Sequence, residues 1–325
     1  MAEWLIEEGI GEDRALLYED GHAIAARVDW PGRLAPGLIA EATLVARVAG
    51  GSRGRAVFPG GEEALVDRLP REASEGAPLR LEIIRSAITE RNRTKLAHSR
   101  PSNAPPRAAL RLREALDATG VTTRAVHRFP TADWDEIWAD AWSGMIAFGG
   151  GTLDFSPTPA MTLVDVDGTL DPRALALAAV PAFAEAVLRF DLAGSVGIDF
   201  PTLAAKADRK LVDEALEAAL SGWPHERTAM NGFGFVQIVS RLERPSLLHR
   251  IAANRIGAAT RLLLRRAEDP ALPPGRLLLT CHPAIKARLR SDWLDALARR
   301  TGRAMEIVSD PGLAIDGGFA QAVQP

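Results

Sequence analysis

Short apolar runs separated by turn-forming residues occupy the first third of the chain. Residues 4–30 hold such runs around GIGED and EDGH, which predicts two or three short strands. Residues 37–97 carry four or five further runs, with turns at regular spacing and no long helical period. That number of short strands predicts a small OB-like β-barrel, a module that often grips single-stranded nucleic acid.

The pattern changes after SRPSNAPPR at residues 99–107, a proline-bearing segment that indicates a linker. Helical and strand periods then alternate. We expect helices over 108–120, 131–145, 171–194, 206–223, 246–269 and 284–302, and strands in a hairpin at 149–167 and at 195–200, 228–241, 276–283 and 304–310. This order favours an α/β fold, a mixed sheet covered by helices, with the small barrel inserted near the N-terminus.

Composition and charge narrow the class of protein. The chain of 325 residues is 47% hydrophobic with a formal net charge of −3, as expected for a soluble globular protein large enough for two domains. The sequence has no bilayer-length apolar run and no opening signal segment, so a cytoplasmic protein is expected. Its single cysteine, Cys281, excludes an internal disulfide and a multi-cysteine zinc site. Arginines gather at 85–100 and 249–266, a pattern shared by phosphate-binding surfaces and solvated helix faces.

Two carboxylates stand out in MTLVDVDGTLDP at residues 161–172. An apolar run delivers Asp165 and Asp167 two residues apart and then breaks at Gly168. Because alternate side chains of a strand point the same way, both carboxylates are expected on one side of a strand end. Such a pair commonly holds a cation.

One interpretation of DVDGT is a phosphatase motif, since it resembles the nucleophile motif of the haloacid-dehalogenase-like family. That chemistry also needs a hydroxyl residue at the end of a second strand and a later acidic pair. Here Asp199 stands where the hydroxyl is expected, and Asp310 with Asp316 is the candidate acidic pair. About half of the chain precedes the motif, whereas that family usually opens with it, so the phosphatase remains the lesser alternative.

A nuclease interpretation uses two strands together. The strand before Gly168, a crossover helix and the strand ending in Asp199 would pair in parallel and bring Asp165, Asp167 and Asp199 to one sheet edge. Carboxylate oxygens suit Mg²⁺ or Mn²⁺. Such an ion polarises a phosphoryl group and activates water, so phosphodiester hydrolysis needs no nucleophile from the protein.

The order of motifs resembles the catalytic core of the ribonuclease E/G family. GGGTLDFSPTPAMTLVDVD is followed by a long helix, GSVGIDF, a second helix, NGFGFVQIVSR and PSL. The resemblance spans nearly the whole chain and is strongest over 149–247. It implies an RNase H-like domain with an inserted OB-like RNA-binding module. The N-terminal strands of the RNase H-like domain would occupy 1–36, the insertion 37–98 and the rest of the catalytic domain 99–325.

The resemblance also implies roles for single residues. Asp165 and Asp199 match metal-binding aspartates, and Asp167 stands where the family usually carries an asparagine, so all three are candidate catalytic residues. The additional charge is expected to raise a carboxyl pKa or to recruit a second ion. Phe58 matches an aromatic residue on which an RNA base stacks. Arg241 is a candidate phosphate contact, offset by about one residue from the family's arginine.

Each candidate also has a structural alternative. Strand-end aspartates shape turns, Phe58 fills a barrel interior equally well, and Arg241 suits a surface ion pair. His282 and the tryptophans of DWDEIWADAW are expected to be structural.

The expected function is Mg²⁺-dependent hydrolysis of single-stranded RNA that leaves a 5′ phosphate, with Mn²⁺ as the alternative ion. An RNA-binding relative without catalysis and the phosphatase remain alternatives. No membrane association is expected. Because Cys281 is the single cysteine, neither zinc nor a zinc-linked tetramer is expected, while a homodimer stays open.

Overall fold

The computed structural model describes residues 2–32, 34–89 and 93–324, and the N-terminal strands form a sheet of their own. Short apolar runs separated by Gly11 and Gly21, both at positive φ, produce the antiparallel strands expected there. The chain returns from the barrel and adds one parallel strand beside the first. The sheet has the order β11-β1-β2-β3, with β1 Glu3–Glu8, β2 Asp13–Glu19, β3 His22–Asp29 and β11 Thr123–Ala125.

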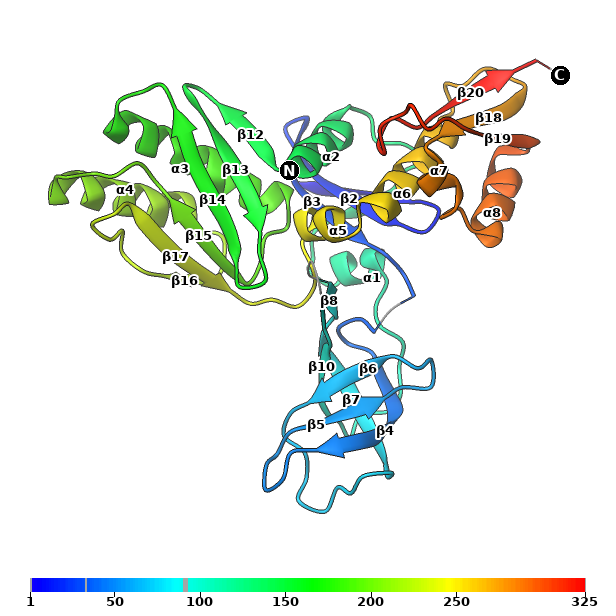
Figure 1. Ribbon diagram of the computed structural model, residues 1–325, viewed down its shortest axis with the longest axis horizontal. Helices are drawn as coiled ribbons and strands as arrows, with labels where there is room; N and C mark the ends of the chain where they lie inside the picture. Colours follow the sequence, from blue (N-terminus) through cyan, green and yellow to red (C-terminus); the bar gives the residue numbers. More distant parts are fainter. Residues whose placement is uncertain (1, 33, 90–92, 325) are drawn as a thin grey trace.

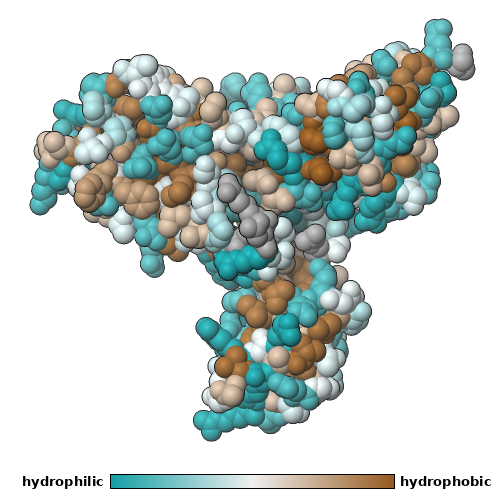
Figure 2. All heavy atoms as spheres, viewed as in Figure 1, coloured by the Kyte–Doolittle hydropathy of each residue, from teal (hydrophilic) through white to brown (hydrophobic). Residues whose placement is uncertain are grey.

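The predicted inserted barrel is confirmed. Five strands close it in the order β10-β6-β5-β4-β7, and β10 pairs with both β6 and β7. Figure 1 shows the barrel below the other sheets, and Figure 2 shows hydrophilic and hydrophobic residues interspersed over the same view. The strands are β4 Ile39–Arg47, β5 Gly54–Val57, β6 Glu63–Val66, β7 Pro78–Arg85 and β10 Ala97–Pro101, and a small hairpin of β8 Ile88–Thr89 and β9 Thr94–Lys95 adjoins them.

A six-stranded sheet carries the predicted aspartates. Its order is β12-β13-β14-β15-β17-β16, in which β14 and β15 pair in parallel and the other neighbours pair antiparallel. The predicted hairpin joins β13 to β14. The strands are β12 Met145–Phe148, β13 Gly151–Pro157, β14 Thr162–Gly168, β15 Ser195–Asp199, β16 His225–Arg227 and β17 Phe235–Ser240.

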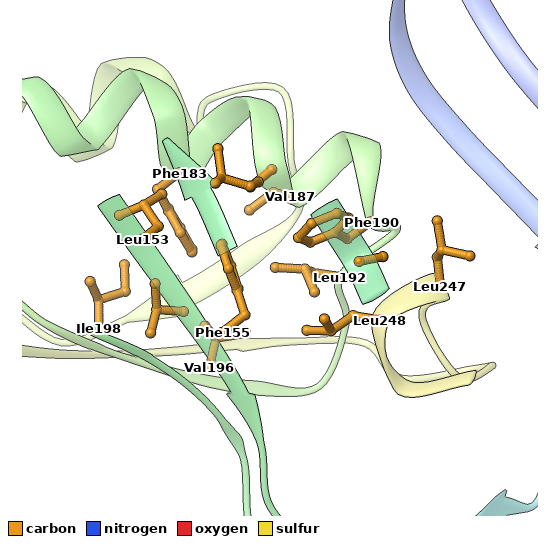
Figure 3. Packing of buried hydrophobic residues seen from close by; sticks show 14 of the residues in the cluster. Leu153, Phe155, Phe183, Val187, Phe190, Leu192, Val196, Ile198, Leu247 and Leu248 are labelled. Carbon is orange, nitrogen blue, oxygen red and sulfur yellow. The ribbon is translucent and has the colours of Figure 1, made fainter. Parts of the chain in front are cut away.

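The helix α3 (Pro172–Arg189) makes the parallel crossover from β14 to β15. Its first turn is capped by Asp171, whose side chain accepts a hydrogen bond from the Ala174 N–H. Its apolar side chains, among them Phe183 and Val187, pack on one face of the sheet, and Figure 3 shows them against side chains of β13 and β15. The helix α4 (Lys206–Ala219) packs beside α3. One face of the sheet is thereby covered.

The C-terminal part forms a third sheet of the order β19-β18-β20. The helix expected over 246–269 is broken at Asn254, whose side chain accepts from the Gly257 N–H and starts a new helix. Ser246 caps the first half, because its hydroxyl accepts a hydrogen bond from the His249 N–H. The elements here are α5 Leu247–Ala253, α6 Arg255–Ala267, β18 Arg276–Cys281, α7 Pro283–Lys286, α8 Ser291–Thr301, β19 Met305–Ser309 and β20 Phe319–Val323.

Two helices link the barrel to the six-stranded sheet. The first, α1 (Leu112–Asp117), is shorter than expected, and the second is α2 (Asp133–Ser143). The tryptophans of α2 are core residues as predicted, with Trp134 and Trp138 buried. Within the described ranges, none of the helices has both the length and the apolar character that a membrane span requires.

The expectation of one mixed sheet is corrected by this arrangement. The N-terminal strands complete their sheet with β11 and do not pair with the strands that carry the aspartates. Buried charge connects the separate sheets instead. The Arg265 guanidinium on α6 donates to Glu7 on β1 over 3.0 Å and to Asp135 on α2 over 2.6 Å.

Candidate active site

Three aspartates lie in one row across three adjacent strands. In the β-sheet register Asp165 on β14 is opposite Asp154 on β13 and opposite Asp199 on β15. Side chains directly opposite one another in register point to the same face of a sheet. The three side chains are exposed, whereas the alternating residues Val164 and Val166 are buried under α3. The row therefore lies on the face that the helix leaves open.

The glycines around the row allow β13 and β14 to meet closely at this end. Gly150 has a φ of +96°, which suits a residue without a side chain in the turn before β13. A Cβ added to Gly168 would lie 2.3 Å from the Gly150 carbonyl oxygen, so no larger residue fits there. The GGG and DG sequences thus hold the ends of both strands in register, and the register sets the row.

Asp167 lies on the same open face, two residues beyond Asp165. Its Oδ1 accepts a hydrogen bond from the Gly168 N–H over 2.8 Å, so its carboxylate also shapes the end of the strand. Its partner across the hairpin is Thr152. Asp167 therefore shapes the turn, as its structural alternative expected, and it also lies beside the row.

The charges of the row act on one another. Partial burial raises the pKa of Asp165 above its ordinary value, and the negative charges of Asp199, Asp167 and Asp154 raise it further. A bound cation would relieve this repulsion, and carboxylate oxygens are donors that Mg²⁺ and Mn²⁺ accept. The donor set fits such an ion in its chemistry. Across the part of the chain that the structure describes, however, no three His, Cys, Asp or Glu side chains form a group that could hold a metal.

Phe58 is placed differently from its expected role. It is 4% exposed and packs in the barrel interior with Leu44, Ala64 and Leu81. A base cannot stack on a ring that the barrel core covers, so the expectation of a stacking platform at Phe58 is corrected in favour of the core alternative.

Arg241 is not brought near the row. Asp199 is opposite Phe235 at the start of β17, and Arg241 follows the other end of that strand. Six residues at ~3.3 Å each place its backbone roughly 20 Å from Phe235. Its side chain is exposed and pairs with Glu243 over 3.0 Å. This position matches the surface ion-pair alternative and sets Arg241 apart from the carboxylates, while a contact of Arg241 with an RNA phosphate stays a prediction.

The other chemical candidates of the sequence have structural roles. The Nδ1 atom of His282 accepts from the Ala284 N–H and caps α7, as expected. Cys281 is buried. Asp310, from the phosphatase alternative, accepts from the Gly312 N–H. It follows β19 in the C-terminal sheet, which lies at the opposite end of the molecule from β14 in Figure 1.

Asp154 is the member of the row that sequence reasoning missed. The available signal was the LDF triplet of the strand 151–157, in which an aspartate between two buried apolar residues must face the other side of the strand. Which aspartates it would meet depends on the register of the hairpin, and the sequence pattern does not fix that register.

No known protein family matches this sequence, and no curated protein matches it.

Proposed function

We propose that the protein is a metal-dependent endoribonuclease that cleaves single-stranded RNA and leaves a 5′ phosphate. The observation that carries the proposal is the register that sets Asp165 between Asp154 and Asp199 on the open face of the sheet. In this proposal the helix-covered sheet belongs to an RNase H-like domain, and the barrel binds RNA as an OB-like module.

The chemistry assigns different tasks to the aspartates. When bound, Mg²⁺ or Mn²⁺ would polarise the scissile phosphoryl group and lower the pKa of an attacking water. Asp165 and Asp199 would hold the ion from adjacent strands. Asp154 and Asp167 add negative charge beside Asp165 and Asp199, which raises the pKa of Asp165. The same negative charge favours the binding of a cation. The open face leaves room for an RNA strand to reach the row.

A second candidate is an RNA-binding protein without catalysis. The observation in its favour is that no group ready to hold a metal occurs among the described residues. Against it stands the row itself, because a pure binder gains nothing from negative charge placed beside phosphates.

Cleavage of a labelled single-stranded RNA tests the proposal. With Mg²⁺ the wild-type protein is expected to produce fragments with 5′ phosphates, and a chelator is expected to stop it. Asp199→Asn should lower the cleavage rate roughly 100- to 1,000-fold and spare RNA binding, since a metal contributes several kcal/mol to the transition state.

Glu226→Gln is the matched control. Glu226 is exposed on the same sheet and is opposite Val239 on β17, away from the row, so its loss should leave the rate unchanged. Cleavage that survives both the chelator and Asp199→Asn would contradict the proposal. RNA binding without any cleavage would favour the second candidate, and release of phosphate from small phosphomonoesters would favour a phosphatase.

A further inference from the structure

An exposed aromatic residue lies beside one end of the aspartate row. Phe233 is 82% exposed, although burial of such a ring would be favourable. It belongs to the turn that leads into β17, and the first residue of that strand, Phe235, is directly opposite Asp199.

The turn that presents Phe233 is well fixed. The Asn231 Oδ1 accepts hydrogen bonds from the Phe233 N–H over 2.9 Å and from the Phe235 N–H over 3.1 Å. The Phe200 N–H donates to the Gly234 carbonyl over 3.2 Å, which ties the turn to the residue after Asp199. A Cβ on Gly234 would lie 2.3 Å from the Phe200 carbonyl oxygen, so the two segments touch closely. The exposed ring is therefore held beside the row by its backbone.

A cavity lies at the other end of the row. It has a volume of about 510 Å³, and Asp154 and Ser156 of β13, Trp142 of α2 and Arg255 of α6 contribute to its lining. This volume is within the range of small-ligand sites, roughly 300–1,000 Å³. The row thus runs from the cavity, across three strands, to the turn of Phe233.

Arg255 presents a positive charge in this cavity. Its guanidinium lies over the Trp142 ring, 3.8 Å from the centroid, and Trp142 stacks on Trp138 with centroids 4.9 Å apart. Its Nη1 donates to the Trp142 carbonyl over 3.2 Å. The aromatic stack orients the guanidinium without neutralising it, since none of the ion pairs seen between described residues includes Arg255.

Neighbouring arginines of the same segment are engaged elsewhere. Arg250 pairs with Asp29 over 3.5 Å, and Arg265 pairs with Glu7 over 3.0 Å. Arg266 donates to backbone carbonyls. Arg255 therefore differs from Arg250 and Arg265 in pairing with no carboxylate among the described residues, and a guanidinium fork matches the oxygens of a phosphate.

We propose that single-stranded RNA crosses the sheet along the aspartate row, with a base stacked on Phe233 and a backbone phosphate held by Arg255. The inference rests on the proposed function and names the substrate path of that same site. Between β13 and β17 the path covers three strand spacings, roughly 14 Å, which a few nucleotides bridge. Proteins bind single-stranded nucleic acid by stacking bases on aromatic side chains and by contacting the phosphate backbone with positive charges.

The test is binding of a fluorescein-labelled single-stranded RNA of about twelve nucleotides, followed by fluorescence anisotropy over a series of salt concentrations. All variants are made in the full chain carrying Asp199→Asn, so that the RNA is not consumed. Phe233→Ala should weaken binding roughly tenfold without changing the salt dependence, because stacking releases no counterions. Arg255→Gln should weaken it by a similar factor and reduce the slope of log affinity against log salt by about 1.

Two further variants sharpen the result. Arg255→Lys keeps the charge and should restore the slope. Arg290→Gln is the matched control, because Arg290 also lies over a tryptophan, at 5.2 Å from the Trp293 centroid, but already pairs with Asp292. It should bind RNA as the parent does. The effects of Phe233→Ala and Arg255→Gln should add, since the two sites are well separated.

The outcomes separate this inference from the proposed function. If the parent binds RNA and wild type cleaves it, but Phe233→Ala and Arg255→Gln bind like the control, the path is wrong and the ribonuclease stands. A slope unchanged in Arg255→Gln contradicts the phosphate contact, and equal affinity for duplex RNA contradicts a single-strand path. If the parent does not bind RNA and wild type does not cleave it, both proposals fail.

Discussion

At the scale of single residues, the charge around Asp165 decides how the site responds to pH. Burial and three neighbouring carboxylates raise the pKa of Asp165. Its proton is therefore released at a higher pH than in an ordinary aspartate, and a cation must compete with that proton. Metal affinity is expected to fall as the pH falls through this raised pKa, because the charged form that binds the ion is then lost.

The variant Asp154→Asn tests this coupling. Removing one negative neighbour favours the charged form of Asp165, so the pKa of Asp165 should move down towards its ordinary value. Titration of side-chain carboxyl signals by NMR in the metal-free protein measures it. Glu226→Gln, at the far side of the sheet, should leave the pKa of Asp165 unchanged. An Asp165 titration that is identical in Asp154→Asn and wild type would show that Asp154 does not act on the site.

Some residues of the site could be found in the sequence and others could not. Asp165 and Asp199 each follow an apolar run in the sequence, so local pattern points to both, although only Asp199 ends its strand and Asp165 lies in the middle of β14. Asp154 stands within a strand, and its neighbours depend on pairing with a distant segment. The exposure of Phe233 depends on which surfaces surround its turn, which no local pattern specifies.

At the scale of elements, Phe58 shows how a correct strand prediction can place a side chain wrongly. The ring follows the last residue of β5, where alternation no longer tells inside from outside. In the folded barrel its N–H donates to the Glu62 carbonyl over 2.9 Å, and the ring is in the core. Similarly, helical periodicity continues through Asn254, while its side-chain cap divides α5 from α6.

Replacing Phe58 by alanine tests its core role. Phe58→Ala should lower the free energy of unfolding of the barrel by about 3–5 kcal/mol, because a large buried ring is lost and a cavity remains. Urea denaturation measures the change. Leu65→Ala on the neighbouring β6 is the control, since Leu65 is 39% exposed, and its effect should be within about 0.5 kcal/mol. Unchanged stability together with weaker RNA binding would instead support a stacking role.

At the scale of the whole molecule, the order of strands and helices predicted the inserted barrel and the β14–α3–β15 crossover. It did not predict the division into separate sheets. That division depends on which strands pair across long stretches of chain, and β11 pairing with β1 is such a case. The crossover matters most for function, because it brings Asp165 and Asp199 opposite each other on adjacent strands from separate parts of the sequence.

A Mn²⁺ titration, followed by the electron paramagnetic resonance signal of the free ion, tests most directly whether Asp165 and Asp199 share a cation. Wild type is expected to bind Mn²⁺. Asp165→Asn and Asp199→Asn should each weaken binding by about 100-fold or more, since even residues that only support metal ligands cost ~10–100-fold. Glu226→Gln should bind as wild type does. Unaltered Mn²⁺ binding in both aspartate variants, or no binding by wild type, would contradict a shared cation at this site.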